Sequence, residues 1–241
     1  MASEDAGRYL GAELSLFAEA RVWGDYVAGE LAPYLGGTVI EVGAGLGTRT
    51  AALALSTSRW IALEPDPEMA RTLERRVASG ALPARVEVHA CALAALPELG
   101  AVDPILSVDV LEHIADDRAE LAEAARRLSP GGHLVVLSPA HEWLYSEFDR
   151  AIGHHRRYTF AALAALTPDG LGMVRRRMLD CVGLAASSVN RFVLRSAMPT
   201  RRQIALWDRV MVRASRWIDP LLGHRVGKSV LVVWRKPGGA G

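Results

Sequence analysis

The sequence predicts an α/β protein with a doubly wound sheet of seven strands, an antiparallel edge hairpin and a helical cap and lid. Short β-branched apolar runs alternate with helical segments from residue 38 to residue 138, a pattern typical of parallel sheets with crossover helices. The first run, residues 38–42, opens directly into a glycine-rich turn. At such a turn a doubly wound sheet holds a nucleotide-like ligand.

The elements are expected in the following order. A helix over 12–31 precedes the first strand. The expected strands are 38–43, 60–64, 85–89, 102–108, 133–138, 172–182 and 229–234, and the helices are 48–56, 67–78, 116–128 and 159–166. Asp116 and Asp117 suit a helix N-terminus, and Thr159 suits an N-cap. The last strand is expected to pair antiparallel with 172–182 at the sheet edge.

We expect one domain over residues 1–241. It comprises an N-terminal helical segment (1–37), a cofactor-binding core (38–138), a lid loop (139–158) and an arginine-rich helical insertion (184–225). The lid is longer than usual for a strand-to-helix connection. Both additions should lie over the carboxyl edge of the sheet, where ligands bind, and they are the candidates for substrate specificity.

Composition excludes several classes of protein. The content is 50% hydrophobic and 23% charged, as in ordinary soluble domains, and the net charge of +1 argues against nucleic-acid binding. No apolar run approaches the ~20 residues of a membrane span, and the acidic start does not resemble a secretory signal. With only two cysteines, we expect a reduced, cytoplasmic protein. Lysine occurs only at 228 and 236, an arginine bias that suggests a bacterial source.

The glycine turn itself indicates the kind of ligand. Its spacing is G-x-G-x-G over Gly43, Gly45 and Gly47, and not the G-x-G-x-x-G that serves a dinucleotide pyrophosphate. Glu41 stands just inside the strand end, where its carboxylate would repel a diphosphate and attract a cation. The pattern therefore favours S-adenosylmethionine over NAD.

Four segments together resemble the class I S-adenosylmethionine-dependent methyltransferases, in the branch of small-molecule enzymes that includes the ubiquinone and menaquinone types. They occur in the family's order over about a hundred residues: EVGAGLG (41–47), WIALEPD (60–66), LSVDVLEHI (106–114) and LSPGGHLVV (128–136). The resemblance implies a Rossmann-like fold and methyl transfer from S-adenosylmethionine, with S-adenosylhomocysteine as product.

The resemblance also implies the cofactor contacts. Glu41 with Gly43, Ala44, Gly45 and Gly47 would hold the methionine part. Glu64, which lies 21 residues after Gly43, would accept hydrogen bonds from the ribose hydroxyls. The remaining candidates are Pro65, Asp66 near adenine, Cys91 and Ala92 after the third strand, and Asp109. Many relatives carry an acid where this chain has Cys91, so adenine would be read there mainly by backbone groups.

The stretch from Asp109 to His113 is open to three interpretations. Glu112 and His113 can serve local hydrogen bonds, as in relatives that use no metal. The pattern D-x-x-E-H is also similar to the E-x-x-E-H cluster of ubiquinone-pathway O-methyltransferases, which binds a divalent metal. His113 could alternatively act in acid–base catalysis. We expect no metal.

The lid concentrates further candidates in a pattern, P-A-H…D…G-H-x-R-R-Y, that resembles one subgroup of the family. His154 is the first candidate for a general base and His141 the second, because imidazole titrates near neutrality. Tyr158 is a further catalytic candidate. Asp149 and Arg157 could contact the substrate, or pair with each other and hold the lid. From the N-terminal helix, Trp23 and Tyr26 are expected near the substrate.

The arginine-rich insertion has two interpretations. It could form amphipathic helices whose arginines are merely solvated. It could also present a basic surface to an anionic or lipid-linked substrate, or to a membrane.

We expect methyl transfer to an oxygen or nitrogen nucleophile of a small molecule, in natural-product (secondary metabolism), sugar or lipid-intermediate biosynthesis. The alternatives are a methyltransferase-fold protein that binds the cofactor without methylating, and, with less support, an NAD-dependent oxidoreductase. The sequence leaves the acceptor, and the choice between monomer and homodimer, undetermined.

Overall fold

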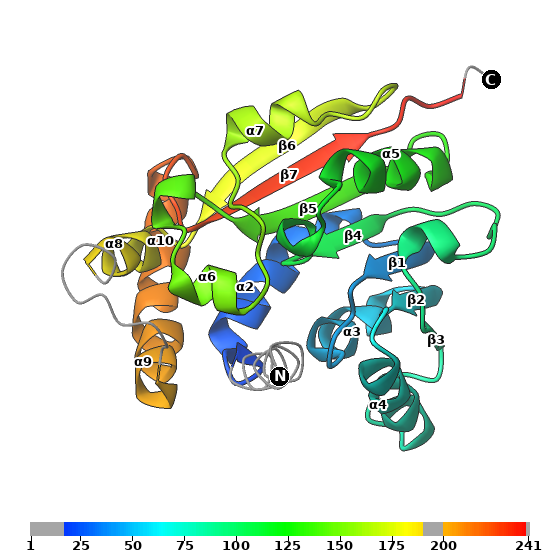
Figure 1. Cartoon of the computed structure of the whole chain (residues 1–241), viewed down its shortest axis with the longest axis horizontal. Coiled ribbons are helices and arrows are strands. Elements are labelled where there is room, and N and C mark those ends of the chain that lie inside the picture. Colours follow the sequence, from blue (N-terminus) through cyan, green and yellow to red (C-terminus); the bar gives the residue numbers. More distant parts are fainter. Residues whose placement is uncertain (1–16, 190–199, 240–241) are drawn as a thin grey trace.

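The computed structural model describes residues 17–189 and 200–239 and shows one seven-stranded sheet, in the order β3-β2-β1-β4-β5-β7-β6 (Figure 1). This sheet confirms the predicted fold class. The strands are β1 (Thr38–Val42), β2 (Arg59–Leu63), β3 (Val86–His89), β4 (Ile105–Val108), β5 (His133–Pro139), β6 (Gly172–Leu179) and β7 (Ser229–Arg235).

Strands β1 to β5 run parallel, and β7 lies between β5 and β6, antiparallel to both. The predicted pairing of the last strand with β6 is therefore confirmed. The central strands are buried on both faces and read as continuous apolar runs, as parallel strands do. Chain order changes direction between β1 and β4, which makes the edge beyond these two strands the expected ligand crevice.

Helices cover both faces of the sheet. One apolar core includes side chains of α2 (Arg21–Leu31), α3 (Thr48–Leu53) and α4 (Pro67–Ala78). The other includes side chains of α5 (Asp117–Arg127) and α7 (Phe160–Ala165). Short turns connect them: η1 (Ala32–Tyr34), η2 (Ala54–Ser56), η3 (Leu93–Ala95) and η4 (Leu111–His113). The N-terminal part of the helix expected over 12–31 lies outside the described residues.

Side chains fix the starts of several helices, as the sequence predicts. Asp116 accepts a hydrogen bond from the Ala119 amide at the start of α5, and Thr159 accepts one from Ala162 at the start of α7. Asp66 accepts from the amides of Glu68 and Met69 and begins α4 in front of Pro67. These caps satisfy amides that no helical carbonyl can reach.

The two additions to the core are helical. The lid is not one open loop, because η5 (Glu142–Leu144) and α6 (Glu147–Ala151) form within it. The insertion contains α8 (Cys181–Val189) and a continuous run of α9 (Arg201–Leu206), the π-helical η7 (Trp207–Val212) and α10 (Arg213–Leu221). Residues 190–199 of the insertion lie outside the described residues. In Figure 1 the orange α9 and α10 stand at one end of the molecule, next to α8 and beyond α2.

Two strand boundaries differ from the prediction by three residues, and the others differ by at most one. The fourth strand begins at Ile105 rather than 102, because Val102 bridges Leu128 outside the sheet. The sixth ends at Leu179, because Asp180 takes a positive φ of 67° and α8 begins at once. The Asp180 carboxylate then accepts the Gly183 amide and closes this turn.

We predict that Gly227→Ala is strongly destabilising. A Cβ at Gly227 would lie 2.4 Å from the carbonyl oxygen of Leu179, and a backbone atom at the β6–β7 junction cannot move aside. The free energy of unfolding should fall by about 3 kcal/mol or more in urea titrations. Gly29→Ala is the control: it has no atom within 4 Å of its added Cβ and should be stabilising by about 0.5–1 kcal/mol in helix α2. Equal stability of the two variants would contradict the packing at Gly227.

Candidate functional site

The glycine loop after β1 forms the floor of the crevice. Gly43 has φ 64°, and a Cβ there would lie 2.7 Å from Val110 Cγ2. At Gly47, φ is 72°, and a Cβ would lie 2.6 Å from Leu73 Cδ2. Only glycine fits either place without strain. The Ala44 amide donates to the Leu63 carbonyl at 2.8 Å, which ties the loop to the end of β2.

Glu64 follows the end of β2, next to the glycine loop, and its carboxylate joins the two segments. It accepts hydrogen bonds from the Gly45 amide at 2.8 Å and the Asp66 amide at 3.0 Å. Its burial beside the loop places Glu64 with the glycines, as the predicted ribose contact requires. Pro65 follows directly, and the Asp66 carboxylate is occupied in capping α4. Both capping hydrogen bonds use Oδ1, and the expected contact of Asp66 with adenine stays a prediction.

Glu41 is buried and serves the interior of the fold. Its Oε2 accepts from Thr50 Oγ1 at 2.5 Å and from Trp60 Nε1 at 2.9 Å. Burial raises the pKa of Glu41, against these two hydrogen bonds. Glu41 therefore joins β1 to the start of α3 and to β2, and its expected contact with the cofactor amino group stays a prediction.

The sequence did not indicate that Arg49 belongs to the site. The Arg49 guanidinium forms an ion pair with the carboxylate of Asp109 across the ends of β1 and β4. Both side chains are partly exposed, and Asp109 has a positive φ of 55°. The Arg49 Nε is buried without a hydrogen-bond partner in the described residues. A cation and an anion thus face each other at the point where the strand order reverses.

Cys91 and Ala92 follow the end of β3. The Cys91 amide donates to the His89 carbonyl at 2.9 Å, and the same carbonyl accepts from the Glu64 amide at 3.1 Å. Cys91 is partly buried against the apolar core and remains a free thiol, whose pKa burial raises. The structure therefore brings Cys91 and Ala92 next to Glu64, as the adenine prediction needs.

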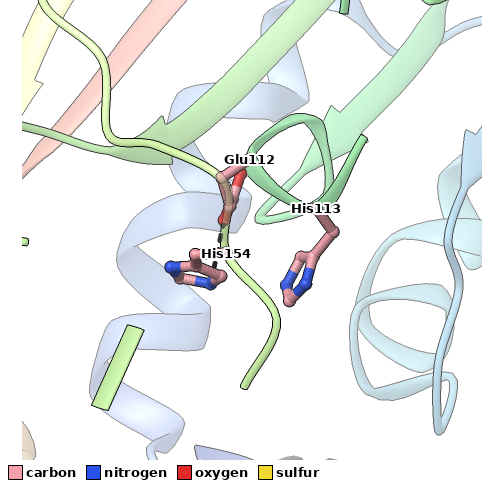
Figure 2. A group of neighbouring side chains, drawn as sticks. All are labelled: Glu112, His113 and His154. Carbon is pink, nitrogen blue, oxygen red and sulfur yellow. Dashed lines mark ion pairs between the residues drawn. The ribbon is translucent and has the colours of Figure 1, made fainter. Parts of the chain in front are cut away.

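Glu112, His113 and His154 gather beyond the end of β4 (Figure 2), and their ligand-type atoms all lie within 4.8 Å of one another. Glu112 and His113 come from η4, and His154 comes from the lid after α6. The His113 and His154 rings meet edge to face, with centroids 4.5 Å apart. Sequence spacing alone could not place His154 beside this pair.

The environment of the cluster favours neutral groups. Burial, reinforced by the charge of Asp109, raises the pKa of Glu112 well above its ordinary value. Burial, with the neighbouring His154, lowers the pKa of His113 to about 4. Neither Glu112 carboxyl oxygen has a hydrogen-bond partner in the described residues, and Oε1 lies 3.9 Å from His154 Nε2.

Asp149 orients His154. Its Oδ1 lies 3.0 Å from His154 Nδ1, so this nitrogen carries the proton and Nε2 is left as the acceptor. Arg157 donates from Nε and Nη2 to the same carboxylate, and Ser146 donates from its amide and hydroxyl. Burial would raise the pKa of Asp149, but the hydrogen bonds from His154 and Arg157 prevail and lower it.

Asp149 and Arg157 pair with each other inside the lid, and their expected contact with the substrate stays a prediction. Asp149 is fully buried, and the Arg157 side chain is mostly buried against it. Of the two sequence alternatives, the internal ion pair is the one that forms. These residues hold the lid and aim His154.

Tyr158 and His141, two further catalytic candidates of the lid, each contact a group inside the protein. The buried Tyr158 hydroxyl donates to Asp117 at 2.8 Å, and burial together with this bond raises its pKa. Tyr158 therefore packs the lid against α5, and its expected catalytic role stays a prediction. His141 Nε2 lies 2.9 Å from the Gly227 carbonyl oxygen, which ties the start of the lid to the turn before β7.

Trp23 and Tyr26 lie buried in the interface between α2 and the cap, by which we mean the insertion helices α8, α9, η7 and α10. The Tyr26 hydroxyl donates to Asp219 at 2.8 Å, and its expected contact with the substrate stays a prediction. The Trp23 ring contacts that of Trp207 at a centroid distance of 5.8 Å. Trp207 in turn lies 6.0 Å from the ring of Phe17. The aromatic residues of α2 thus pack against the cap.

Lys228 is a second site residue that the sequence did not reveal. It begins the turn into β7, and its Nζ lies 4.2 Å from the centre of the Trp207 ring. The charges of Asp180, Arg157, Asp109 and Asp149 all act on it, so it lies between lid, cap and strand ends. Burial lowers the pKa of Lys228, against the charge of Asp180.

The acids around Lys228 are already occupied by other donors. Trp207 and Ser215 donate to Asp180, Arg49 pairs with Asp109, and Asp149 is held by His154 and Arg157. Over residues 17–189 and 200–239, no hydrogen bond or ion pair of the Lys228 ammonium forms. Its rarity in an arginine-rich chain was the only sequence signal for this residue.

Residues 40–136 match the family described as "Methyltransferase domain". A ubiquinone biosynthesis O-methyltransferase of Xanthomonas oryzae pv. oryzae is 27% identical over 112 residues, which are 46% of each chain. The chain spans less than half the length of the curated relatives it matches. The matched region is thus the core of the sheet and excludes the lid and cap.

Two solved structures share the fold over most of the chain. The [4+2]-cyclase SpnF has a TM-score of 0.63 at 18% identity, covering 89% of this chain and 81% of its own. Geranyl diphosphate methyltransferase in complex with S-adenosylmethionine has a TM-score of 0.61 at 16% identity, covering 89% and 84%. Residues 40–136 thus form a methyltransferase domain, on a fold that most of the chain shares with these structures, which supports the predicted class.

We predict that His113 makes stability fall in acid. Its folded pKa of about 4 lies below the ordinary 6.5, so between these values the unfolded chain binds a proton that the folded chain does not. This contribution is fully present above pH 6.5 and is lost as the pH falls toward 4. The free energy of unfolding, measured by urea titration, should fall between about pH 7 and about pH 4.5. This fall should be smaller by about 2 kcal/mol in His113→Gln than in the wild type. His89→Gln on β3 is the control, and the same loss in all three proteins would contradict the prediction.

Proposed function

We propose that this protein transfers a methyl group from S-adenosylmethionine to a small-molecule acceptor. The observation that carries the proposal is the combination of the glycine loop, Glu64 and the Arg49–Asp109 pair at the β1–β4 switch point. On one side of this crevice, the Glu64 carboxylate can accept hydrogen bonds from hydroxyl groups. On the other side, Arg49 supplies a cation and Asp109 an anion. S-adenosylmethionine presents the complementary groups: ribose hydroxyls, a carboxylate and an ammonium.

In this proposal Glu64 accepts hydrogen bonds from the ribose hydroxyls, and backbone groups near Cys91 and Ala92 contact adenine. The amino-acid end lies over Gly43 to Gly47, its carboxylate on Arg49 and its ammonium on Asp109. The donor set fits, because Arg49 has a buried Nε without a partner in the described residues and Asp109 is partly exposed. When bound, the cofactor supplies an electrophilic methyl group on a sulfonium.

The acceptor is placed between lid and cap, beside His154 and Lys228. His154 Nε2 takes the proton from an oxygen or nitrogen nucleophile, and Asp149 keeps the imidazole in the required tautomer. Lys228 attracts an oxygen that is becoming anionic, because its neighbouring acids are already paired. Holding the acceptor in line with the methyl group supplies much of the remaining acceleration. Natural-product, sugar and lipid-intermediate acceptors all fit this chemistry.

The proposed transfer uses no metal. The alternative, a divalent ion on Glu112, His113 and His154, rests on their mutual distances. A second alternative is a protein of this fold that binds the cofactor without methylating. One similar structure is that of a [4+2]-cyclase, so the fold is not confined to methyltransferases. Product analysis with labelled cofactor separates these functions.

We predict that Glu64→Ala weakens S-adenosylhomocysteine binding by about 1–3 kcal/mol in titration calorimetry, because hydrogen bonds to a charged group are lost. Glu64→Gln keeps the shape and one acceptor and should lose less. Glu68→Ala, an exposed acid on α4, is the matched control. Unchanged affinity in Glu64→Ala would remove Glu64 from the cofactor site.

We predict that His154→Ala lowers turnover about 10²–10⁴-fold with cofactor affinity intact. The measurement is single-turnover transfer of a labelled methyl group to whichever acceptor a screen yields. His155→Ala, the exposed neighbour, should keep wild-type turnover. EDTA should leave wild-type turnover unchanged. A loss of turnover below tenfold in His154→Ala would show that positioning alone drives the transfer. If EDTA abolishes the activity and a divalent ion restores it, the cluster is a metal site instead.

A further inference from the structure

The outer face of the cap helix is apolar and exposed. Leu206, Val210, Trp217 and Leu221 are 52%, 57%, 81% and 85% exposed. Their spacing of four, seven and four residues places them on one side of the continuous run from Arg201 to Leu221. Large apolar side chains in such a row indicate a contact surface rather than scattered exposure.

The opposite face of the same run is buried and contains all its acids. Asp208 accepts the amides of Val22 and Trp23 at the start of α2. Asp219 accepts Tyr26 and the amides of Asp180 and Cys181. With both carboxylates turned inward, the outer face carries no negative side chain.

Every charge on the outside of this run is an arginine. Arg201 lies 3.7 Å from Glu19, and Arg216 lies over the ring of Tyr26. Arg202, Arg209 and Arg213 are exposed and form no ion pair with any residue in 17–189 or 200–239. The apolar row is thus flanked by uncompensated positive charge.

A second copy of the chain does not suit this surface. A twofold interface pairs the same patch with itself, so the two arginine rows would face each other. An anionic lipid surface instead satisfies both features: tryptophan and leucine enter the acyl boundary while arginines meet the headgroups. At 1.5 Å per residue the run is about 30 Å long, and among the described residues no helix is long and apolar enough to cross a membrane.

We propose that the α9–η7–α10 helix docks in the plane of an anionic lipid bilayer through its apolar row and flanking arginines. The orange run in Figure 1 lies at one end of the molecule, as such docking needs. The inner side of this helix carries Trp207, which contacts Lys228. Docking would therefore bring the acceptor side of the sheet edge to the membrane surface. The docking itself does not depend on the proposed methyl transfer.

The test is flotation of the full-length chain with vesicles of phosphatidylcholine alone and with 30% phosphatidylglycerol. We expect the protein to float only with anionic vesicles, and to do so less at high salt. Trp217→Ser with Leu221→Ser, and separately Arg209→Gln with Arg213→Gln, should each reduce partitioning at least tenfold. Leu55→Ser with Arg71→Gln is the matched control, exposed on other elements, and should partition as wild type.

Three outcomes would overturn the proposal: no flotation with anionic vesicles, an equal loss in the control variant, or a homodimer by light scattering that the Trp217 and Leu221 substitutions dissociate. S-adenosylhomocysteine affinity, measured on the same preparations, should be unchanged in every variant. That measurement distinguishes a failed docking surface from a misfolded protein, and from failure of the proposed function.

Discussion

The buried carboxylate of Asp219 holds the cap to the N-terminal helix and to the edge of the sheet. It accepts hydrogen bonds from the Tyr26 hydroxyl of α2 and from the amides of Asp180 and Cys181 where β6 turns into α8. One side chain on α10 thereby joins the N-terminal helix, the sheet edge and the cap. A buried carboxylate is costly without partners, so these three elements must assemble together or not at all.

The lid follows the same physical rule at another place. Asp149 is buried and is satisfied by Arg157, His154 and Ser146. The network that fixes the lid also fixes the tautomer of His154, so lid folding and base positioning are one event. At the strand ends, the acids nearest Lys228 are already paired with other donors, and this is why we place the acceptor there.

The sequence by itself determined the sheet and the cofactor crevice. The strand at Thr38–Val42, the positive φ of Gly43 and Gly47, and the Asp116 cap depend on residues close together in the chain. Local propensity and periodicity therefore predict them. The position of Glu64 beside the glycine loop followed from the same logic, because a parallel neighbour strand must end at the same edge.

Only the tertiary structure decided which polar groups are free to act. Tyr158 and Tyr26 looked catalytic or substrate-binding, but each donates to a distant aspartate. The sequence did not mark Arg49 or Lys228 as site residues, but the fold brings them to the strand ends. In the arginine-rich segment, Asp208 faces α2 and leaves the arginines on the outer side. Hydrogen bonds between residues far apart in sequence leave no periodic signal, so their partners emerge only once the chain is folded.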